Sequence, residues 1–365
     1  MNECFGKIYN NRRILVTGHT GFKGSWLVMW LSKMGAKVTG YALNPSTSPS
    51  HIEILNVDYL SIIGDIRDKD KLQDIITKVK PDIIFHLAAQ SLVRRSYREP
   101  IETLSTNIIG TANLLEVSRQ SPSTRAVVVI TSDKCYKNRE QTRGYREDDT
   151  LGGYDPYSAS KGCAEIVTSS YRHSFFPPNE YGRGHTTLIA SARAGNVIGG
   201  GDWAEDRLIP DIARAVSKKE AVSIRNPDAT RPWQHVLESL SGYLMLGQKL
   251  LQGEPEYADA WNFGPGEDGN LSVATLVKQL KQHWNGINYK FSSESPDLHE
   301  AQLLQLDCSK AHTKLHWKPV WNIDEALEMT GTWYDRYYNS GNVLSEKQLT
   351  EYIRTAKHKN LEWTI

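Results

Sequence analysis

Short apolar runs and longer amphipathic stretches alternate along the first half of this chain. Runs rich in β-branched residues predict strands at Arg13–Thr17, Lys37–Tyr41, Asp82–His86 and Ala126–Thr131. Between these runs, apolar positions recur at helical spacing and predict helices at about Gly24–Met34, Lys69–Lys78 and Thr103–Arg119. This alternation indicates parallel βαβ units, so we predict an α/β fold with a Rossmann-type doubly wound parallel sheet.

The second half is less regular. Further strands are predicted at Thr187–Ser191 and Ala260–Gly264, separated by a stretch from Gly195 to Pro232 that is rich in Gly, Asp and Pro. Later apolar patterns predict a helix at Leu271–His283, a short strand at Leu303–Asp307 and a helix at Asp324–Tyr338. From Ser345 onward the chain is mostly polar with a few large apolar residues, which predicts a docked tail.

The length of 365 residues favours two lobes over one, because a single hydrophobic core stops growing near about 250–300 residues. We predict a larger domain of residues 1–193 plus about 232–266. A smaller, interleaved C-terminal domain is expected from residues 194–231 and 267–345, followed by a tail at 346–365.

Composition excludes several partners. The 43 Lys and Arg against 42 Asp and Glu give a net charge of +1, which predicts no nucleic acid partner. No apolar run approaches the about 18–20 residues of a membrane helix, and the first ten residues lack the pattern of a signal peptide. The four cysteines lack metal or disulfide spacing, and His312 and His316 lack further ligands, so we expect no metal and a cytoplasmic location.

A glycine-rich turn joins the first strand to the first helix. Gly18, Gly21 and Gly24 follow Arg13–Thr17 directly and precede an apolar helix, the context that a dinucleotide site requires. Glycines allow the backbone to turn tightly and approach a pyrophosphate, whose charge the N–H groups of the helix start stabilise. The sequence therefore predicts a dinucleotide cofactor here.

Two residues with acid–base character stand four apart on a predicted helix, Tyr154–Ser170. Tyr157 and Lys161 therefore fall on one face, where a lysine ammonium is expected to lower the pKa of the phenol. Upstream, Ser132, Asp133 and Lys134 follow the strand Ala126–Thr131, at the edge where parallel sheets place catalytic groups. Asp133 and Lys134 add an acid and a base that a simple reductase does not need.

These motifs resemble the extended short-chain dehydrogenase/reductase superfamily, and within it the sugar-nucleotide 4,6-dehydratase branch. The resemblance lies in Thr17–Leu27, Thr131–Tyr136, Gly152–Ser158 and Arg231–Val236. It implies an NAD-dependent dehydratase with Ser132, Asp133, Lys134, Tyr157 and Lys161 as the catalytic residues. The lysine at position 134 is the most discriminating, because other branches carry glutamate there.

The resemblance also implies binding residues. For NAD these are Gly18, Gly21, Phe22, Lys23, Gly24, Asp65, Ile66, Leu87, Ala88, Gln90, Asn107, Tyr157 and Lys161. Asp65 could equally be the N-cap of the following helix. The second strand ends Gly40–Asn44 without an acidic residue or an arginine pair, so the residues alone leave NAD against NADP open. For the substrate they are Gln90, Ser132, Arg193, Asn196, Arg231, Asn262 and His299. For Arg231 and Asn262, a structural contact that joins the two lobes is the alternative.

The implied reaction has three stages, with CDP-glucose as the implied substrate. Tyr157 takes the 4-hydroxyl proton while hydride leaves C4. Lys134 then removes the C5 proton while Asp133 protonates the departing 6-hydroxyl. Finally hydride returns to C6 and a proton to C5. The resemblance further implies a homodimer, or a higher assembly, that supplies 3,6-dideoxyhexoses for O-antigen. The alternatives are a GDP-mannose or dTDP-glucose dehydratase, a sugar-nucleotide 4-epimerase, and a non-enzymatic nucleotide sensor.

Overall fold

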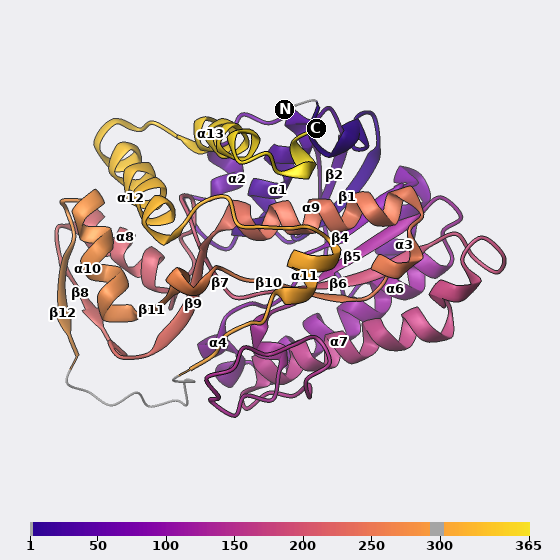
Figure 1. Cartoon of the computed structure of the whole chain (residues 1–365), viewed down its shortest axis with the longest axis horizontal. Helices are drawn as coiled ribbons and strands as arrows, with labels where there is room; N and C mark the ends of the chain where they lie inside the picture. The colour runs from indigo at the N-terminus through magenta and orange to yellow at the C-terminus, as the bar shows by residue number, and fades with distance from the viewer. Residues whose placement is uncertain (1–2, 293–302) are drawn as a thin grey trace.

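A seven-stranded parallel sheet forms the centre of the computed structural model, which describes residues 3–292 and 303–365 (Figure 1). Its order is β10, β6, β5, β4, β1, β2, β3. The strands are β1 (Arg13–Thr17), β2 (Lys37–Ala42), β3 (Leu60–Ile63), β4 (Ile83–His86), β5 (Ala126–Ile130), β6 (Leu188–Ala194) and β10 (Ala260–Phe263). The predicted Rossmann-type fold is confirmed, and its strand order reverses between β1 and β4, where such sheets bind ligands.

Helices cover both faces of the sheet because its strands are apolar on both sides. Val16 and Val128 face a cluster that contains residues of α1 (Phe22–Lys33) and α9 (Val236–Gln252). Their neighbours Leu15 and Val127 face the opposite cluster, with residues of α3 (Lys69–Val79) and α6 (Gly110–Arg119). The long helix α7 (Pro156–Ser174) packs on α6 on that second face.

A second lobe lies at one end of the molecule (Figure 1). Its sheets join β7 (Asn196–Ile198), β9 (Thr230–His235) and β11 (Asn270–Ser272), and β8 (Ala221–Ile224) with β12 (Asn288–Phe291). Its helices are α8 (Leu208–Lys218), α10 (Val273–His283) and α12 (Ile323–Ser340). A separate apolar cluster around Trp203, Trp284 and Trp333 fills the lobe. The chain enters it after β6 and returns to the first lobe with α9, so the two lobes are interleaved.

Two expected elements differ in the structure. The predicted strand Leu303–Asp307 is reduced to a single bridge between Leu306 and Tyr145. The Tyr145 N–H donates to the Gln305 carbonyl and the Tyr145 carbonyl accepts from the Asp307 N–H, each at 2.9 Å, and the pairing extends no further among the described residues. The predicted helix Thr103–Arg119 begins earlier, at α5 (Pro100–Leu104). A π-helical turn at Ser105–Ile109 joins α5 to α6.

The C-terminal tail is docked as predicted. Helix α13 (Ser345–His358) buries Tyr352 and Ile353, and Trp363 stacks on Phe5 near the other end of the chain. Figure 1 accordingly shows the two termini close together, and the Gly6 N–H donates to the Ile365 carbonyl at 2.8 Å. Among the described helices, none is both long and apolar enough to span a bilayer.

Candidate active site

The glycine turn brings the start of α1 against the end of β4. Gly18 has a φ of +75°, and a Cβ there would lie 2.7 Å from the Ala88 backbone nitrogen. A Cβ on Gly24 would lie 2.2 Å from the Gly18 carbonyl oxygen. Because both side chains would collide with backbone, the turn requires glycine at these positions. Gly21 is the N-cap residue of α1 and has no side chain to cap the helix, so the first turn suits a bound phosphate.

This turn opens into a cavity of about 1110 Å³ between the two lobes. Most of the residues predicted from the sequence line it. They are Gly18, Gly21, Phe22, Lys23, Gly24, Asp65, Ile66, Leu87, Ala88, Gln90, Ser132, Asp133, Lys134, Tyr157, Lys161, Asn196 and Arg231. The structure therefore gathers the glycine turn, the groups after β5 and the Tyr–Lys pair of α7 in one space large enough for a dinucleotide and a second ligand.

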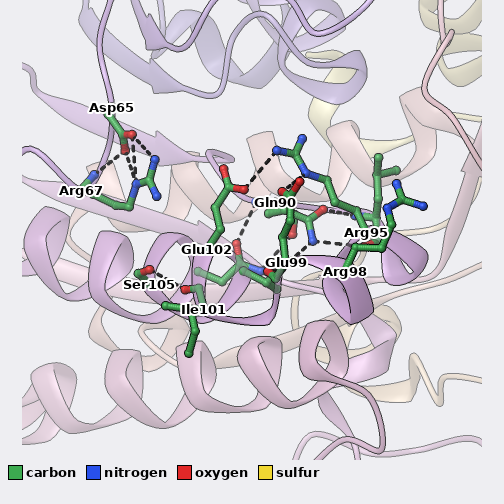
Figure 2. Close-up of polar contacts among 12 residues, drawn as sticks. Asp65, Arg67, Gln90, Arg95, Arg98, Glu99, Ile101, Glu102 and Ser105 are labelled. Atoms are coloured by element: carbon green, nitrogen blue, oxygen red, sulfur yellow. Dashed lines mark hydrogen bonds and ion pairs between the residues drawn. The ribbon is translucent and has the colours of Figure 1, made fainter.

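Asp65 lines the cavity as a paired carboxylate. Its oxygens accept hydrogen bonds from the Arg67 side chain at 2.6 and 3.0 Å, as Figure 2 shows, and Arg67 holds its pKa below the usual value. The alternative that Asp65 is the N-cap of the next helix is wrong, because Asp68 caps α3 by accepting from the Lys71 N–H.

Gln90 and Asn107 form one rigid unit beside the cavity. The Gln90 amide donates to Thr103 Oγ1 at 2.8 Å and to the Leu92 carbonyl at 3.1 Å, close to the ion pairs of Arg95 drawn in Figure 2. The Asn107 side chain accepts a hydrogen bond from the Gln90 N–H and donates one to the Gln90 carbonyl, each at 2.9 Å. It also donates to Ser160 Oγ. Asn107 itself does not line the cavity, so its contribution to any ligand is through Gln90.

The segment after β5, Thr131–Tyr136, places Ser132, Asp133 and Lys134 on the cavity wall together with its two end residues. Ser132 Oγ donates to Asp133 Oδ1 at 2.8 Å, and Lys134 Nζ lies 3.4 Å from the same oxygen and 3.5 Å from Asn196 Oδ1. Asp133 is 1% exposed, and its Oδ2 has no hydrogen-bond partner among the described residues. A buried carboxylate oxygen without a partner is costly unless it meets a ligand, which suits a proton donor or acceptor.

Tyr157 and Lys161 lie on the first turns of α7, which Asp155 caps by accepting from the Ser158 N–H. Burial lowers the pKa of Lys161 to about 8. Burial raises the pKa of Tyr157 to about 12, opposed by the Ser132 hydroxyl. Within the protein alone the pKa of Tyr157 is therefore not lowered as the Tyr–Lys spacing predicted, because desolvation of the phenolate outweighs the lowering by Ser132 and Arg207.

Lys23, on the first turn of α1, is the second buried lysine of the site. Burial lowers its pKa to about 7, and its Nζ donates to the Tyr243 hydroxyl at 3.2 Å. The sequence singled out Lys23 but not Tyr243. Tyr243 lies in α9, whose continuous apolar pattern marks it only as core.

Two predicted substrate residues do not reach the cavity. Arg193 is 3% exposed and pairs with Glu165 at 2.8 Å, and Asn262 is fully buried and accepts from the Tyr136 hydroxyl at 2.7 Å. Both lie behind the Thr131–Tyr136 segment and are absent from the cavity wall. The third, His299, lies outside the described residues.

The second lobe adds cavity residues that the sequence did not indicate. Arg207 pairs with Asp202 at 3.1 Å and donates to Ser91 Oγ at 2.9 Å, so it links the lobes across the cavity. Arg225 pairs with Asp206 at 3.1 Å, next to apolar side chains of β8. Neither arginine lies in a recognisable motif, and the only available signal was their place in the Gly-, Asp- and Pro-rich stretch.

Comparison with known proteins agrees with this arrangement. A family model described as GDP-mannose 4,6 dehydratase matches residues 15–330. CDP-glucose 4,6-dehydratase of Salmonella typhimurium is 50% identical over 94% of this chain and 97% of its own length.

Solved structures share the fold. UDP-glucose 4-epimerase of Thermotoga maritima, crystallised with UDP-glucose, is 25% identical with a TM-score of 0.74 over 88% of this chain and 98% of that one. The dTDP-glucose 4,6-dehydratase of Bacillus anthracis, in complex with NAD, is 21% identical with a TM-score of 0.72 over 90% and 98%.

Proposed function

This chain belongs to the GDP-mannose 4,6-dehydratase family, and from that premise we propose that it converts CDP-glucose to CDP-4-dehydro-6-deoxyglucose with bound NAD. The observation that carries the proposal is the placement of Ser132, Asp133 and Lys134 in one cavity with Tyr157 and Lys161. An epimerase needs only the serine, the tyrosine and the lysine of the helix. The additional acid and base match the elimination of water.

The residues divide into two groups by the step that each serves. Tyr157 takes the proton of the 4-hydroxyl, and Ser132 orients that hydroxyl. The glycine turn would hold NAD, which would supply the acceptor for the hydride of C4 and the donor of that hydride to C6. Lys134 removes the C5 proton and Asp133, whose Oδ2 has no protein partner among the described residues, protonates the 6-hydroxyl as it leaves, so that water is lost across C5–C6. A proton returns to C5 when hydride returns to C6.

The cofactor choice is supported by the residues present. Gly18 and Gly24 leave no room for side chains between α1 and β4, and the uncapped first turn of α1 faces the cavity. The B. anthracis dehydratase of the same fold was solved with NAD. Burial raises the pKa of Tyr157 to about 12. The positive charge of a bound nicotinamide ring would stabilise the phenolate and so oppose this rise.

The nucleotide end of the substrate belongs at the second-lobe end of the cavity. The first lobe's glycine turn takes the cofactor, and the chemistry lies between the lobes, so the remaining space lies among α8, β8 and β9. Arg207, Arg225 and Arg231 line that end together with Val222 and Ile224. Guanidinium groups beside an apolar slot suit a nucleoside diphosphate.

One experiment separates the candidate functions. Purified protein is incubated with CDP-glucose, and the alkali-induced absorbance of a 4-keto sugar is recorded together with the mass of the product. A product lighter by one water supports the dehydratase, whereas an epimerised product of unchanged mass supports the 4-epimerase. Displacement of a labelled nucleotide by CDP, UDP, GDP and dTDP then tests the base, and binding without any turnover would favour a nucleotide sensor.

We also propose that the chain forms a homodimer through α5, α6 and α7. These helices pack together. Ile101 of α5, Ile109 of the π-helical turn between α5 and α6, and Ile166 of α7 are 75%, 54% and 56% exposed. Three large apolar side chains exposed on adjacent helices are typical of a covered surface. The free cysteines support a reducing compartment, for which we propose the cytoplasm.

A further inference from the structure

A buried polar network lies behind the Thr131–Tyr136 segment. Its central residues, Glu165 and Arg193, do not line the cavity, whereas Thr131 and Tyr136, which they bind, do. Glu165 continues the spacing of Tyr157 and Lys161 by one more helical turn of α7. The Glu165 carboxylate accepts hydrogen bonds from Thr131 Oγ1, from Ser191 Oγ at 2.7 Å and from Arg193 Nη2 at 2.8 Å. Glu165 thus ties α7 to the first residue of the segment.

Arg193 binds the other end of the segment, Tyr136. Its Nη1 donates to the Tyr136 hydroxyl at 2.7 Å and to the Glu147 carbonyl at 3.0 Å, and its guanidinium carbon lies 5.0 Å from the centre of the Tyr136 ring. The Tyr136 hydroxyl in turn donates to Asn262 Oδ1. The first and last residues of a six-residue segment are therefore bound to the same Glu165–Arg193 ion pair.

We propose that Glu165 and Arg193 are positioning residues: the pair holds both ends of the segment against α7 and so fixes the elimination groups relative to the oxidation groups. Asp133 and Lys134 lie between the two ties, and Tyr157 and Lys161 lie on the helix that carries Glu165. A misplacement of about 1 Å between such groups costs about 10²-fold in rate. This inference rests on the proposed function, because the rate that the pair affects is the rate of the proposed dehydration.

The burial of the pair indicates that it has no direct contact with substrate. The two side chains are 4% and 2% exposed, and neither lines the cavity. Burial would raise the pKa of Glu165, but Arg193 and the hydroxyls of Thr131 and Ser191 outweigh it and keep the pKa below its usual value. A charged, fully engaged carboxylate serves as an anchor rather than as a proton carrier.

Thr131→Val cuts one tie while it preserves the shape of the side chain. Thr187→Val is a control for burial and for the loss of one hydrogen bond, because Thr187 is equally buried at 5% and donates one hydrogen bond at 2.7 Å, to the Thr124 carbonyl. Thr131 lines the cavity and Thr187 does not, so the double variant below, at two residues that do not line the cavity, completes the test. We expect both variants to lose similar stability. Only Thr131→Val should lower kcat, by about 10- to 100-fold, with KM within about twofold.

The double variant Glu165→Leu with Arg193→Met removes the ion pair without leaving a lone buried charge, so it is expected to fold. We expect wild-type nucleotide affinity and a kcat lowered at least as far as in Thr131→Val. Reduced cofactor should accumulate during turnover, because elimination is then slower than oxidation. Each variant is measured for unfolding midpoint, kcat, KM and the near-ultraviolet absorbance of the reduced cofactor.

A double variant that is stable and turns over at the wild-type rate would overturn the positioning role, as would equal kcat values for Thr131→Val and Thr187→Val. If the double variant fails to fold, the two threonine variants decide. The proposed function fails separately: if the wild-type protein converts a different sugar nucleotide, the same variant-to-wild-type ratios measured with that substrate still test the two ties.

Discussion

The two sides of the Thr131–Tyr136 segment are both polar and both buried, yet they differ in how their oxygens are satisfied. Behind the segment, both oxygens of Glu165 and the hydroxyl of Tyr136 have partners within the protein. On the cavity side, Asp133 Oδ2 has none among the described residues, and Lys134 Nζ reaches its two acceptors only at 3.4 and 3.5 Å. Satisfied buried groups hold structure, whereas an unsatisfied one is available to a ligand.

The largest effect should come from the cavity side. Tyr157→Phe removes the proton acceptor for the 4-hydroxyl and leaves a ring of the same size, so we expect kcat to fall by about 10²–10⁴-fold. Stability should fall by only about 1 kcal/mol, because the contact that the hydroxyl loses is the single one with Ser132. Steady-state kinetics with a 4-keto sugar assay, together with thermal unfolding, checks this. Undiminished turnover would remove Tyr157 from the chemistry and revive the nucleotide sensor.

Asp133→Asn tests the division of labour within the cavity. An amide of the same shape cannot protonate the leaving 6-hydroxyl, so dehydration should fall by about 10²–10³-fold. Oxidation at C4 uses Tyr157 and should continue, which predicts a build-up of reduced cofactor in a single turnover. Stopped-flow absorbance measures that build-up. If oxidation and dehydration fall together, Asp133 does not serve elimination alone.

A matched pair of Arg→Lys substitutions compares the two sides directly. Arg193→Lys loses the two-sided grip of the guanidinium on Glu165 and Tyr136, so we expect about 1–3 kcal/mol less unfolding free energy. Its KM should be unchanged. Arg231→Lys, on the cavity wall, should raise KM about tenfold and change stability by less than about 0.5 kcal/mol. Denaturant titration and initial rates check both predictions. A raised KM for Arg193→Lys together with a loss of stability for Arg231→Lys would contradict the roles assigned to the two arginines.

The sequence predicted the fold and the cavity residues that lie in short local motifs. The glycine turn, the Ser132–Lys134 run and the Tyr157–Lys161 spacing each depend on neighbours within a few residues, and all line the cavity. The Asp68 cap of α3 shows the limit even locally, since two aspartates three residues apart suited the same helix start and the structure uses the second.

Arg193 and Asn262 show why the remainder required the structure. Both lie near the carboxyl ends of strands of the parallel sheet, Arg193 in β6 and Asn262 in β10. Glu165 and Tyr136, from distant parts of the chain, bind them behind the segment. Conversely, Arg207 and Arg225 reach the cavity because the second lobe folds over the first. Pairings across 28 residues or more, such as Arg193 with Glu165, leave no periodic signal in one sequence. The raised pKa of Tyr157 is likewise a result of burial, which spacing does not report.

The smallest effect concerns pH and the charge of Glu165. Its folded-state pKa lies below the ordinary 4.5, so the unfolded chain binds a proton more readily than the folded protein does. The contribution of this group to stability is therefore complete above pH 4.5 and is lost as the pH falls through the folded pKa, by at most about 1.4 kcal/mol per pH unit.

Because Glu165→Leu with Arg193→Met lacks the group, the stability difference between wild type and this variant should be constant from pH 6 to 8 and shift against the wild type below pH 4.5. Urea titrations across this range measure the difference, in which the other titrating groups cancel. A difference that is flat down to pH 3 would mean that the folded protein does not selectively stabilise the charged form of Glu165. That result would contradict the role of Glu165 as a charged anchor.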